Sequence, residues 1–554
     1  MANMNVRGFL GWSFAVLLTV PTAEAATPLD KIDQAQVQGR LSAERAILLK
    51  AQVLKGANSL PREYRTDEWL PERCGTRVTS EIVENWDSYS IETQNALREI
   101  MARPAQQKSL VSPDGYFVIR YDTTGPHAVP SEDENSSGVP DYAENLAAYA
   151  DSSYRTQVLQ MGYSPPPPDG DGKYDIYTQN LGTGLYGFCE PESPGPAPWT
   201  DYTSFIVVHN NFLGFPPNDD PEGPQKGAMK VTVAHEFHHA VQFSYNASTS
   251  GRLWFMEVTS TWMEDVVFDL VNDNYNYLSV FFTEPQTPLT NTGIHMYSSF
   301  IWNQYLAQNF GPEIIRQVWQ ENISFQAVPA LDRVLQTRSS SLGREFSRFA
   351  LWNFYTGSRN DSQHYEEGSF YPEMTLHQNA GGPMITGRSQ SVPALAAQYE
   401  SLPAGDSVEK ARLVFTGRTS GVWGAHVLFE NSPVIRGYPF PLIANNHGDT
   451  TFFGLDSFPR VVLVGAQIKT SQLTVFEYFD YSYTAYPFFI QGDLNEDLAV
   501  TVEDVVYLSN WVFLAIPPPE NRPEAADLNC DGRLGPADLV LLLNFLFLEL
   551  PFAC

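Results

Sequence analysis

The motif H-E-F-H-H at residues 235–239 constrains this chain more than any other feature of its sequence. Side chains four residues apart lie about 40° apart around an α-helix, so His235 and His239 can ligate one metal ion at about 2.0–2.1 Å. Glu236 follows the first histidine and can reach a metal-bound water as a general base. Apolar residues throughout 231–243 predict that this helix is buried. We therefore expect a catalytic zinc site, with a buried helix carrying satisfied histidines as the alternative.

The remaining histidine of the motif is expected to stay outside the metal site. His238 lies about 60° around the helix from His235, so it should pack against neighbours or line the substrate side of the site. A catalytic zinc also needs a third protein ligand and an open position. The segment W-F-M-E-V-T-S-T-W-M-E-D at 254–265 supplies two candidates, Glu257 and Glu264.

A histidine pair followed by such a glutamate resembles the gluzincins, the superfamily of thermolysin and the zinc aminopeptidases. In that superfamily a glutamate on the next helix completes the site, which implies that Glu257, 18 residues after His239, is the third zinc ligand. Glu264, two helical turns further on, would then orient a ligand histidine. The two glutamates could also exchange these roles, and the sequence leaves that open.

The gluzincin resemblance also implies an oxyanion donor, for which Tyr297 stands at the matching place along the chain. Core packing is an equally good explanation of a tyrosine there. The stretch 115–320, with D-E-N-S-S-G-V-P-D-Y at 133–142, resembles a family of secreted bacterial metalloproteases, many of which end in a dockerin or sorting module. The segment 227–230 is similar to the amine-binding loop of the aminopeptidases but lacks its glutamate, so an endopeptidase is favoured.

Two acidic loops near the C-terminus have the ligand spacing of EF-hand calcium loops, in which positions 1, 3, 5, 9 and 12 supply oxygen ligands. The two copies begin 34 residues apart. We expect each to wrap its oxygens round one Ca²⁺ ion. The first loop offers Asp493, Asn495, Asp497, Thr501 and Asp504, and the second offers Asp527, Asn529, Asp531 and Asp538.

Each loop leads into an apolar helical pattern, and the pair resembles a type I dockerin, an all-α module of EF-hand type. The resemblance implies a cohesin-like or cell-envelope partner for residues 488–554. Leu498 stands where a turn glycine is usual, and Val502 and Glu503 occupy positions that help to choose the cohesin, so the usual partner is not implied. Residues 133–141 form a shorter calcium candidate, for which a plain turn is an equal explanation.

The N-terminal segment contains Arg7, an apolar run of about 12 residues and an A-E-A site at 23–25, which predicts a secretory signal peptide. That run is too short to span a bilayer, and no membrane span is expected. An excess of 64 acidic over 34 basic residues, a net charge of −30, argues against nucleic acid as a partner. The protein is therefore expected outside the cell, in solution or associated with the cell surface.

Export favours disulfides among the four cysteines, and we pair Cys74 with Cys189 and Cys530 with Cys554. Three connectivities are open to four cysteines. An alternative makes Cys74 a thiolate that caps the zinc ion until a propeptide is removed.

The predicted fold is multidomain α+β: a gluzincin-like peptidase domain (sheet plus helical lobe), a β-sandwich and a small dockerin-like module. The domains run as follows: 1–25 signal peptide, 26–110 helical propeptide or support, 111–378 zinc metallopeptidase, 379–487 β-sandwich and 488–554 calcium-binding module. The predicted function is zinc-dependent hydrolysis of extracellular proteins or peptides. The alternative is a non-catalytic surface or scaffold protein that retains the peptidase fold without its activity.

Overall fold

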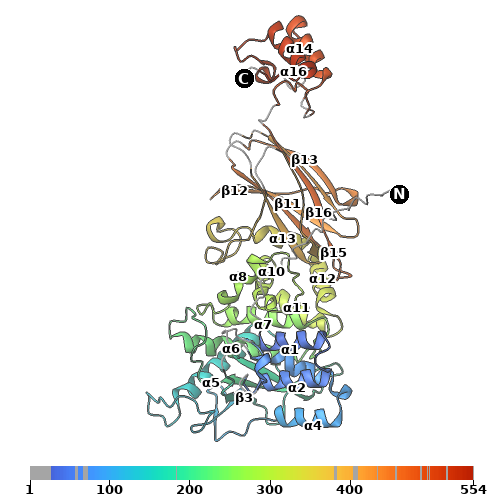
Figure 1. Cartoon of the computed structure of the whole chain (residues 1–554). Coiled ribbons are helices and arrows are strands. Elements are labelled where there is room, and N and C mark those ends of the chain that lie inside the picture. Colours follow the sequence, from blue (N-terminus) through green and yellow to red (C-terminus); the bar gives the residue numbers. More distant parts are fainter. Residues whose placement is uncertain are drawn as a thin grey trace, which may run out of the picture. The chain divides into compact units, whose positions relative to one another are not determined.

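The structure is a computed structural model of the chain (Figure 1). It describes residues 27–56, 60–65, 73–182, 184–379, 384–403, 408, 410–432, 434–455, 458–486, 490–495, 497, 499–518 and 522–552. The predicted signal peptide lies outside these residues. The chain divides into two compact units, one of Met1–Met256 and Met263–Asp273 and one of Glu257–Trp262 and Asn274–Cys554. This multi-unit α+β architecture confirms the coarse fold class predicted from the sequence.

The first unit is built on a five-stranded mixed sheet with the strand order β1-β2-β3-β5-β4. The three central strands pair in parallel, whereas β1 and β4 are antiparallel edge strands. Strand β4 therefore has one backbone edge that no other strand of this sheet covers. The strands are β1 (Lys108–Val111), β2 (Phe117–Tyr121), β3 (Tyr174–Gln179), β4 (Gly187–Pro194) and β5 (Tyr202–His209).

Helices cover both faces of this sheet. On one face, the N-terminal helices share an apolar core with Tyr177, Phe188 and Phe205 of the strands. On the other face, Phe237 of α6 makes edge contacts with Phe117 and Tyr174. The N-terminal region therefore forms part of the same core as the sheet. The helices are α1 (Pro28–Val37), α2 (Ala43–Val53), α3 (Thr76–Glu84), α4 (Ile91–Ile100), α5 (Asp141–Tyr154), which continues as a π-helix (Arg155–Gln160), and α6 (Pro224–Gln242).

The second unit opens with a helical lobe packed around large aromatic side chains. Trp302 and Trp319 are fully buried, and Phe349 of α13 packs edge-on against Trp302. Helix α7 (Leu253–Val267) belongs to both units, because residues 257–262 count with the second. The other helices are α8 (Tyr275–Thr283), α9 (His295–Ser298), α10 (Phe300–Phe310), α11 (Glu313–Asn322), α12 (Ala327–Thr337) and α13 (Leu342–Trp352).

A β-sandwich follows, in which a four-stranded sheet, β13-β10-β16-β7, and a five-stranded sheet, β12-β11-β14-β9-β6, enclose one apolar core. Side chains alternate between core and surface along β10, as a half-buried strand requires. A short pair, β8 (Val392–Pro393) with β15 (Phe476–Glu477), lies outside the two sheets. The sheet strands are β6 (His377–Gln378), β7 (Met384–Arg388), β9 (Ala396–Pro403), β10 (Lys410–Gly417), β11 (Trp423–Asn431), β12 (Val434–Pro439), β13 (His447–Phe453), β14 (Arg460–Gln467) and β16 (Phe479–Tyr486).

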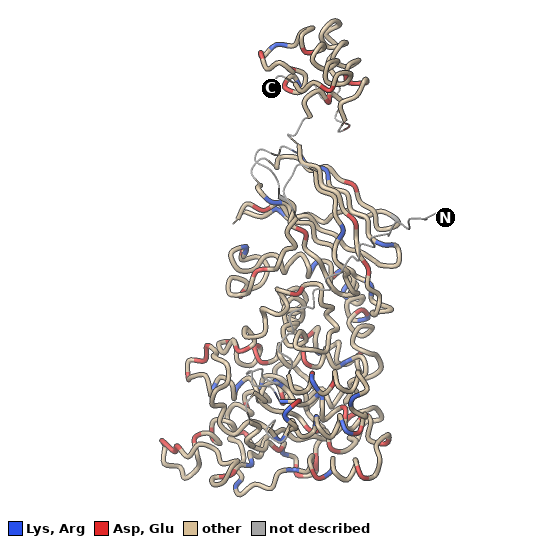
Figure 2. The backbone as a smooth tube through the Cα atoms, viewed as in Figure 1, with Lys and Arg blue, Asp and Glu red and all other residues tan. Residues whose placement is uncertain are grey.

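The C-terminal segment forms a small helical cluster of α14 (Val502–Leu514), α15 (Pro523–Ala526) and α16 (Pro536–Leu548). Its core is small, with Leu508 and Leu542 among its fully buried side chains. Of the helices in the described residues, none combines the length and apolar character needed to cross a membrane. Acidic and basic residues are interspersed along both units in Figure 2, so the acidic surplus is not confined to the C-terminal loops.

Candidate metal centre

Helix α6 carries the H-E-x-x-H motif through the interior of the first unit. The helix begins with Pro224, directly after Gly223, whose φ of 105° is a backbone conformation that glycine adopts at low cost. Every residue from Gly227 to Gln242 is buried. Helix α6 is therefore enclosed by the protein along the whole motif, as the sequence predicts.

The Nε2 atoms of His235 and His239 face each other, so that one metal ion could bind both. Their Nε2 atoms lie 3.1 Å apart, close to the roughly 3.3 Å expected for two nitrogens on one tetrahedral zinc ion. Each Nδ1 atom has its own partner: His235 contacts Glu264 Oε1 at 2.7 Å, and His239 contacts Gln242 Oε1 at 2.8 Å. Such partners fix the ring orientation of metal-binding histidines.

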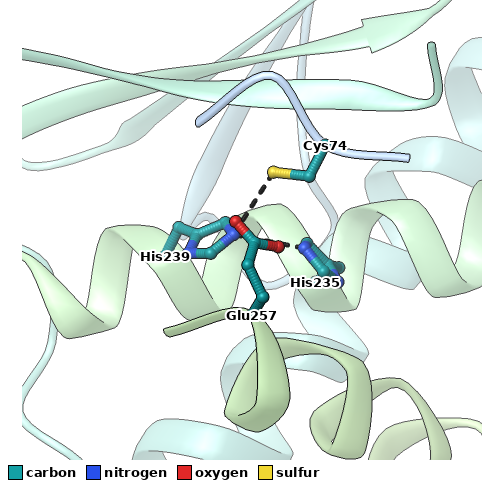
Figure 3. Close-up of side chains that lie close together, drawn as sticks. All are labelled: Cys74, His235, His239 and Glu257. Carbon is teal, nitrogen blue, oxygen red and sulfur yellow. Dashed lines mark hydrogen bonds between the residues drawn. The ribbon is translucent and has the colours of Figure 1, made fainter. Parts of the chain in front are cut away.

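Glu257 and Glu264 lie two turns apart on α7 and have different surroundings. Glu257 lies beside Cys74, His235 and His239, and the possible ligand atoms of these four buried residues all lie within 4.8 Å of one another. Figure 3 shows the four side chains converging from α6, α7 and the segment that precedes α3. The donor set of two imidazoles, a carboxylate and a thiol suits Zn²⁺. Cys74 therefore joins the three predicted ligands.

Glu264 lies behind His235 and belongs to a buried charge network. Arg73 bonds to both carboxylate oxygens of Glu264 and, through Nη1, to Asp273 at 2.7 Å. Burial raises the pKa of Asp273, and the neighbouring Arg73 opposes that shift. The ring of Tyr186 lies under the guanidinium, with its centroid 5.3 Å from Cζ. Glu264 is thus placed to orient His235, the role expected if Glu257 is the ligand.

Glu236, the expected base, faces the short segment Arg73–Thr76. Its Oε2 accepts a hydrogen bond of 3.0 Å from Thr76 Oγ1, and Cys74 Sγ lies 3.4 Å from the same oxygen. Strand β4 also approaches closely, since a Cβ atom on Gly187 would lie 3.1 Å from Glu236 Cγ. The base is therefore enclosed by the N-terminal segment and the edge strand.

The predicted Cys74–Cys189 disulfide is wrong, because neither cysteine is disulfide-bonded. Cys74 points at the histidines, with Sγ 3.3 Å from His239 Nε2. Cys189 lies on β4 near the hydroxyl of Tyr174, and burial raises the pKa of its thiol far above the usual value. Cys530 is disulfide-bonded. Its predicted partner, Cys554, lies outside the described residues.

Two further residues of the sequence prediction have other surroundings. His238 is buried away from the metal centre, where Nδ1 contacts Gln157 Oε1 at 3.0 Å and the ring packs edge-on against Tyr163. Burial holds its pKa well below the usual value, so it stays neutral. Tyr297 is buried on α9, with its ring 6.0 Å from that of Tyr277. Its role as an oxyanion donor stays a prediction.

The two C-terminal loops have closely similar hydrogen bonds. Asp504 Oδ1 accepts from the backbone N–H of Leu494, and Asp538 Oδ1 accepts from that of Leu528, at 2.7 and 2.9 Å. Within the described part of the chain, the one group of three or more His, Cys, Asp or Glu side chains placed to hold a metal ion is the Cys74 cluster. Five further side chains of the loops accept hydrogen bonds from backbone N–H groups: Asn495, Asp497, Asp527, Asn529 and Asp531. Calcium binding therefore stays a prediction.

The shorter acidic segment folds like the second C-terminal loop. Asp133 accepts from the N–H groups of Ser137 and Gly138, as Asp527 accepts from those four and five residues further on. Gly138 has a φ of 85°, which favours glycine at this turn. The segment therefore forms a turn, and calcium binding by it stays a prediction, as it does for the C-terminal loops.

Comparisons with known proteins do not assign a function to this chain. A family of unknown function, DUF6055, matches residues 224–375, a stretch that begins with helix α6. No curated protein matches the chain. The solved structure of a family GH115 4-O-methyl-α-glucuronidase, with specificity for decorated arabinogalactans, has 7% sequence identity and a TM-score of 0.13, over 84% of this chain and 70% of its own. Such a TM-score does not indicate a common fold.

Sequence reasoning missed the residues that support the site. Arg73, Thr76 and Gln242 contact predicted site residues, but no spacing rule connects Thr76 with Glu236, 160 residues away, or Arg73 with Glu264, 191 residues away. Gln242 could have been found, because it follows His239 by three residues on the same helix. For Arg73, the only sequence signal is its position beside Cys74.

Proposed function

We propose that this protein is a secreted zinc-dependent peptidase, and that it cleaves within polypeptide chains. The observation that carries the proposal is the buried group of His235, His239 and Glu257 with Glu236 beside it on α6. When bound, zinc polarises a carbonyl oxygen and makes water acidic enough to lose a proton near neutral pH. Glu236 accepts that proton and passes it to the leaving amine.

The surrounding residues keep these groups in place. Glu264 and Gln242 hold the two imidazoles so that both Nε2 atoms face the same point. The ion pairs of Arg73 neutralise two carboxylates, Glu264 and Asp273, next to the site. Tyr297 is our candidate for the hydroxyl that stabilises the oxyanion.

The decisive experiment compares Glu236→Gln with wild-type protein in zinc content and in digestion of a broad peptide library. The assay is run before and after treatment with an organomercurial, which binds thiols, because the Cys74 thiol lies beside the candidate metal ligands. Removal of the base should lower turnover by about 10²–10⁴-fold with zinc content unchanged. Glu345→Gln is the matched control, since Glu345 is also a buried glutamate, bonded to Tyr305 in the helical lobe. Absence of zinc, or equal turnover by the Glu236→Gln protein, would refute the proposal.

One observation favours a second candidate, a scaffold protein with a structural metal. Four protein ligands form a closed site, and closed tetrahedral sites are typical of structural zinc. In that case zinc would be retained, no peptide would be cut before or after mercurial treatment, and removal of zinc would only lower stability.

We also propose that residues 488–554 form a dockerin-like, calcium-stabilised attachment module for a cohesin-like or cell-envelope partner. Repulsion between the loop carboxylates should be relieved by Ca²⁺, so that binding and folding are coupled. Apolar side chains on its surface are available to a partner: Val502, Val506, Val540 and Phe547 are each more than half exposed. Titration calorimetry of the full chain with Ca²⁺ tests the module, and the absence of binding would contradict it.

A further inference from the structure

We propose that Cys74 is the fourth ligand of the metal ion and keeps the enzyme latent. The inference rests on the proposed function and concerns the regulation of the same site. A catalytic zinc ion requires one coordination position for water or substrate. Cys74 occupies the side of the metal centre at which Glu236 lies, so the thiol and the reacting water compete for one position.

The sulfur distances fit direct ligation. For a tetrahedral ion with a Zn–S bond of about 2.3 Å and a Zn–N bond of about 2.0–2.1 Å, sulfur and nitrogen should lie about 3.5 Å apart. Cys74 Sγ lies 3.3 Å from His239 Nε2. The side chain is fully buried together with the other three candidate ligands. On ligation the thiol loses its proton to solvent, and it regains one when water displaces the sulfur.

The residues on either side of Cys74 hold it in this position. Arg73 is fixed by its buried ion pairs to Glu264 and Asp273. Gly75 donates its N–H to the carbonyl of Gly187 at 2.9 Å, and Cys74 forms a parallel β-bridge with the same residue. Gly75 also permits a close approach, because a Cβ atom there would lie 2.4 Å from Leu54 Cδ2.

The same segment blocks the base and the strand edge. Thr76 donates to Glu236, so the expected base already has a partner. The Gly187 carbonyl lies at the start of β4, an edge strand of the sheet, and such edges bind extended peptides by adding a strand. Cys74 and Gly75 use this edge themselves. Three requirements of peptide hydrolysis, a metal position, a base and a strand edge, are therefore occupied by three consecutive residues, Cys74, Gly75 and Thr76.

Latency of this kind does not depend on a dissociable inhibitor. Helices α1, α2 and α3, which flank the segment, share the apolar core of the sheet, in which Leu49 of α2 and Val78 of α3 are buried together with Phe188 of β4. The blocking segment is thus held by the fold on both sides, and its effective concentration at the metal is high. Activation requires that the sulfur leave the metal, by chemical modification of the thiol or by displacement of the segment.

The test uses the full chain loaded with Co²⁺ in place of zinc, because a thiolate ligand gives a thiolate-to-cobalt charge-transfer band in the near ultraviolet. We expect the band in wild-type protein and in Cys189→Ala, and its loss in Cys74→Ala with one metal ion still bound. Cys189 is the matched control, since it is also a buried cysteine outside any disulfide. In the zinc form, Cys74→Ala should hydrolyse peptides at least about tenfold faster than wild type, because water gains the vacated position.

A second measurement keeps the proposal testable if Cys74→Ala folds poorly. Native wild-type protein is treated with iodoacetamide, and the labelled cysteines are identified by mass spectrometry. Cys74 should be alkylated much faster after removal of zinc by a chelator, whereas the rate at Cys189 should not change. Labelling of Cys74 that does not depend on zinc would overturn ligation.

The outcomes separate this inference from the proposed function. A charge-transfer band that persists in Cys74→Ala overturns the inference, whatever the activity. Loss of the metal ion from Cys74→Ala also overturns it, because Cys74 would then be a structural ligand. Loss of the band with the metal retained, but with no hydrolysis by either protein, would establish the ligand and refute the peptidase function.

Discussion

The replacement Arg73→Met tests how strongly the buried charge network supports the metal centre. Arg73, Glu264 and Asp273 have side-chain exposures of 2%, 1% and 0%. Removal of one partner from a buried ion pair costs about 3–5 kcal/mol, because it leaves a charge without compensation. Methionine fills a similar volume, so the loss is mainly electrostatic. A loss of that size corresponds to a fall in the melting temperature of the first unit of roughly 6–20 °C.

The matched control is Arg412→Met in the sandwich. Arg412 bonds to both carboxylate oxygens of Asp449, at 3.0 and 2.7 Å, but the two side chains are 52% and 40% exposed. Exposed pairs contribute about 0.2–1 kcal/mol, so this variant should melt within a few degrees of wild type. Scanning calorimetry of the full chain, with a chelator present to exclude metal binding, resolves the transitions of the separate units.

The effect of Arg73→Met should depend on pH. Burial already raises the pKa of Asp273, and loss of Arg73 removes the charge that opposes this rise. A group with a raised pKa in the folded state binds more protons there than in the unfolded state, so its contribution is favourable at low pH and is lost as pH rises. The variant should therefore be less destabilised near pH 5 than near pH 8. A destabilisation equal to that of Arg412→Met, or one that grows as pH falls, would refute the electrostatic argument.

Three further predictions concern other parts of the chain. Gly187→Ala should lower the stability of the first unit by about 1–3 kcal/mol, since its Cβ atom would lie 2.8 Å from the carbonyl oxygen of Val207. A melting temperature equal to that of wild type, measured in the presence of a chelator, would contradict this. Gly465→Ala should destabilise the sandwich by a similar amount, because its Cβ atom would meet the ring of Phe479 at 2.3 Å. Its zinc content should stay at the wild-type value, and a loss of zinc would be inconsistent with separate units. Asp527→Ala should remove one of two calcium-binding events in titration calorimetry, and wild-type stoichiometry in this variant would exclude the second loop.

Local patterns in the sequence were enough to find the centre of the candidate site. The spacing of His235, Glu236 and His239 places all three on one helix wherever that helix lies, because helical geometry is independent of the rest of the fold. The alternation of apolar residues after position 380 likewise predicted the paired sheets, since a strand with one buried face has period two. Coarse fold class therefore follows from local periodicity.

The choice between Glu257 and Glu264 as the third metal ligand required a weaker kind of inference. Glu257 was preferred over Glu264 through a family resemblance, because both lie on one face of the same helix. The structure distinguishes them by their neighbours, since Glu264 is bonded to Arg73 and His235 while Glu257 is grouped with the candidate ligands. Distances between α6 and α7 depend on packing, which the order of residues along α7 does not encode.

What the sequence by itself determined was the set of chemical groups and their local spacing. It left two roles open for Cys74, a disulfide with Cys189 and a thiolate that caps the zinc ion. The disulfide was preferred and is wrong. Only the tertiary structure decided that the segment before α3 passes along β4 and turns the Cys74 sulfur toward His239. The physical reason is that contacts between residues more than 100 positions apart depend on how helices and sheet pack together, and local patterns do not specify that packing.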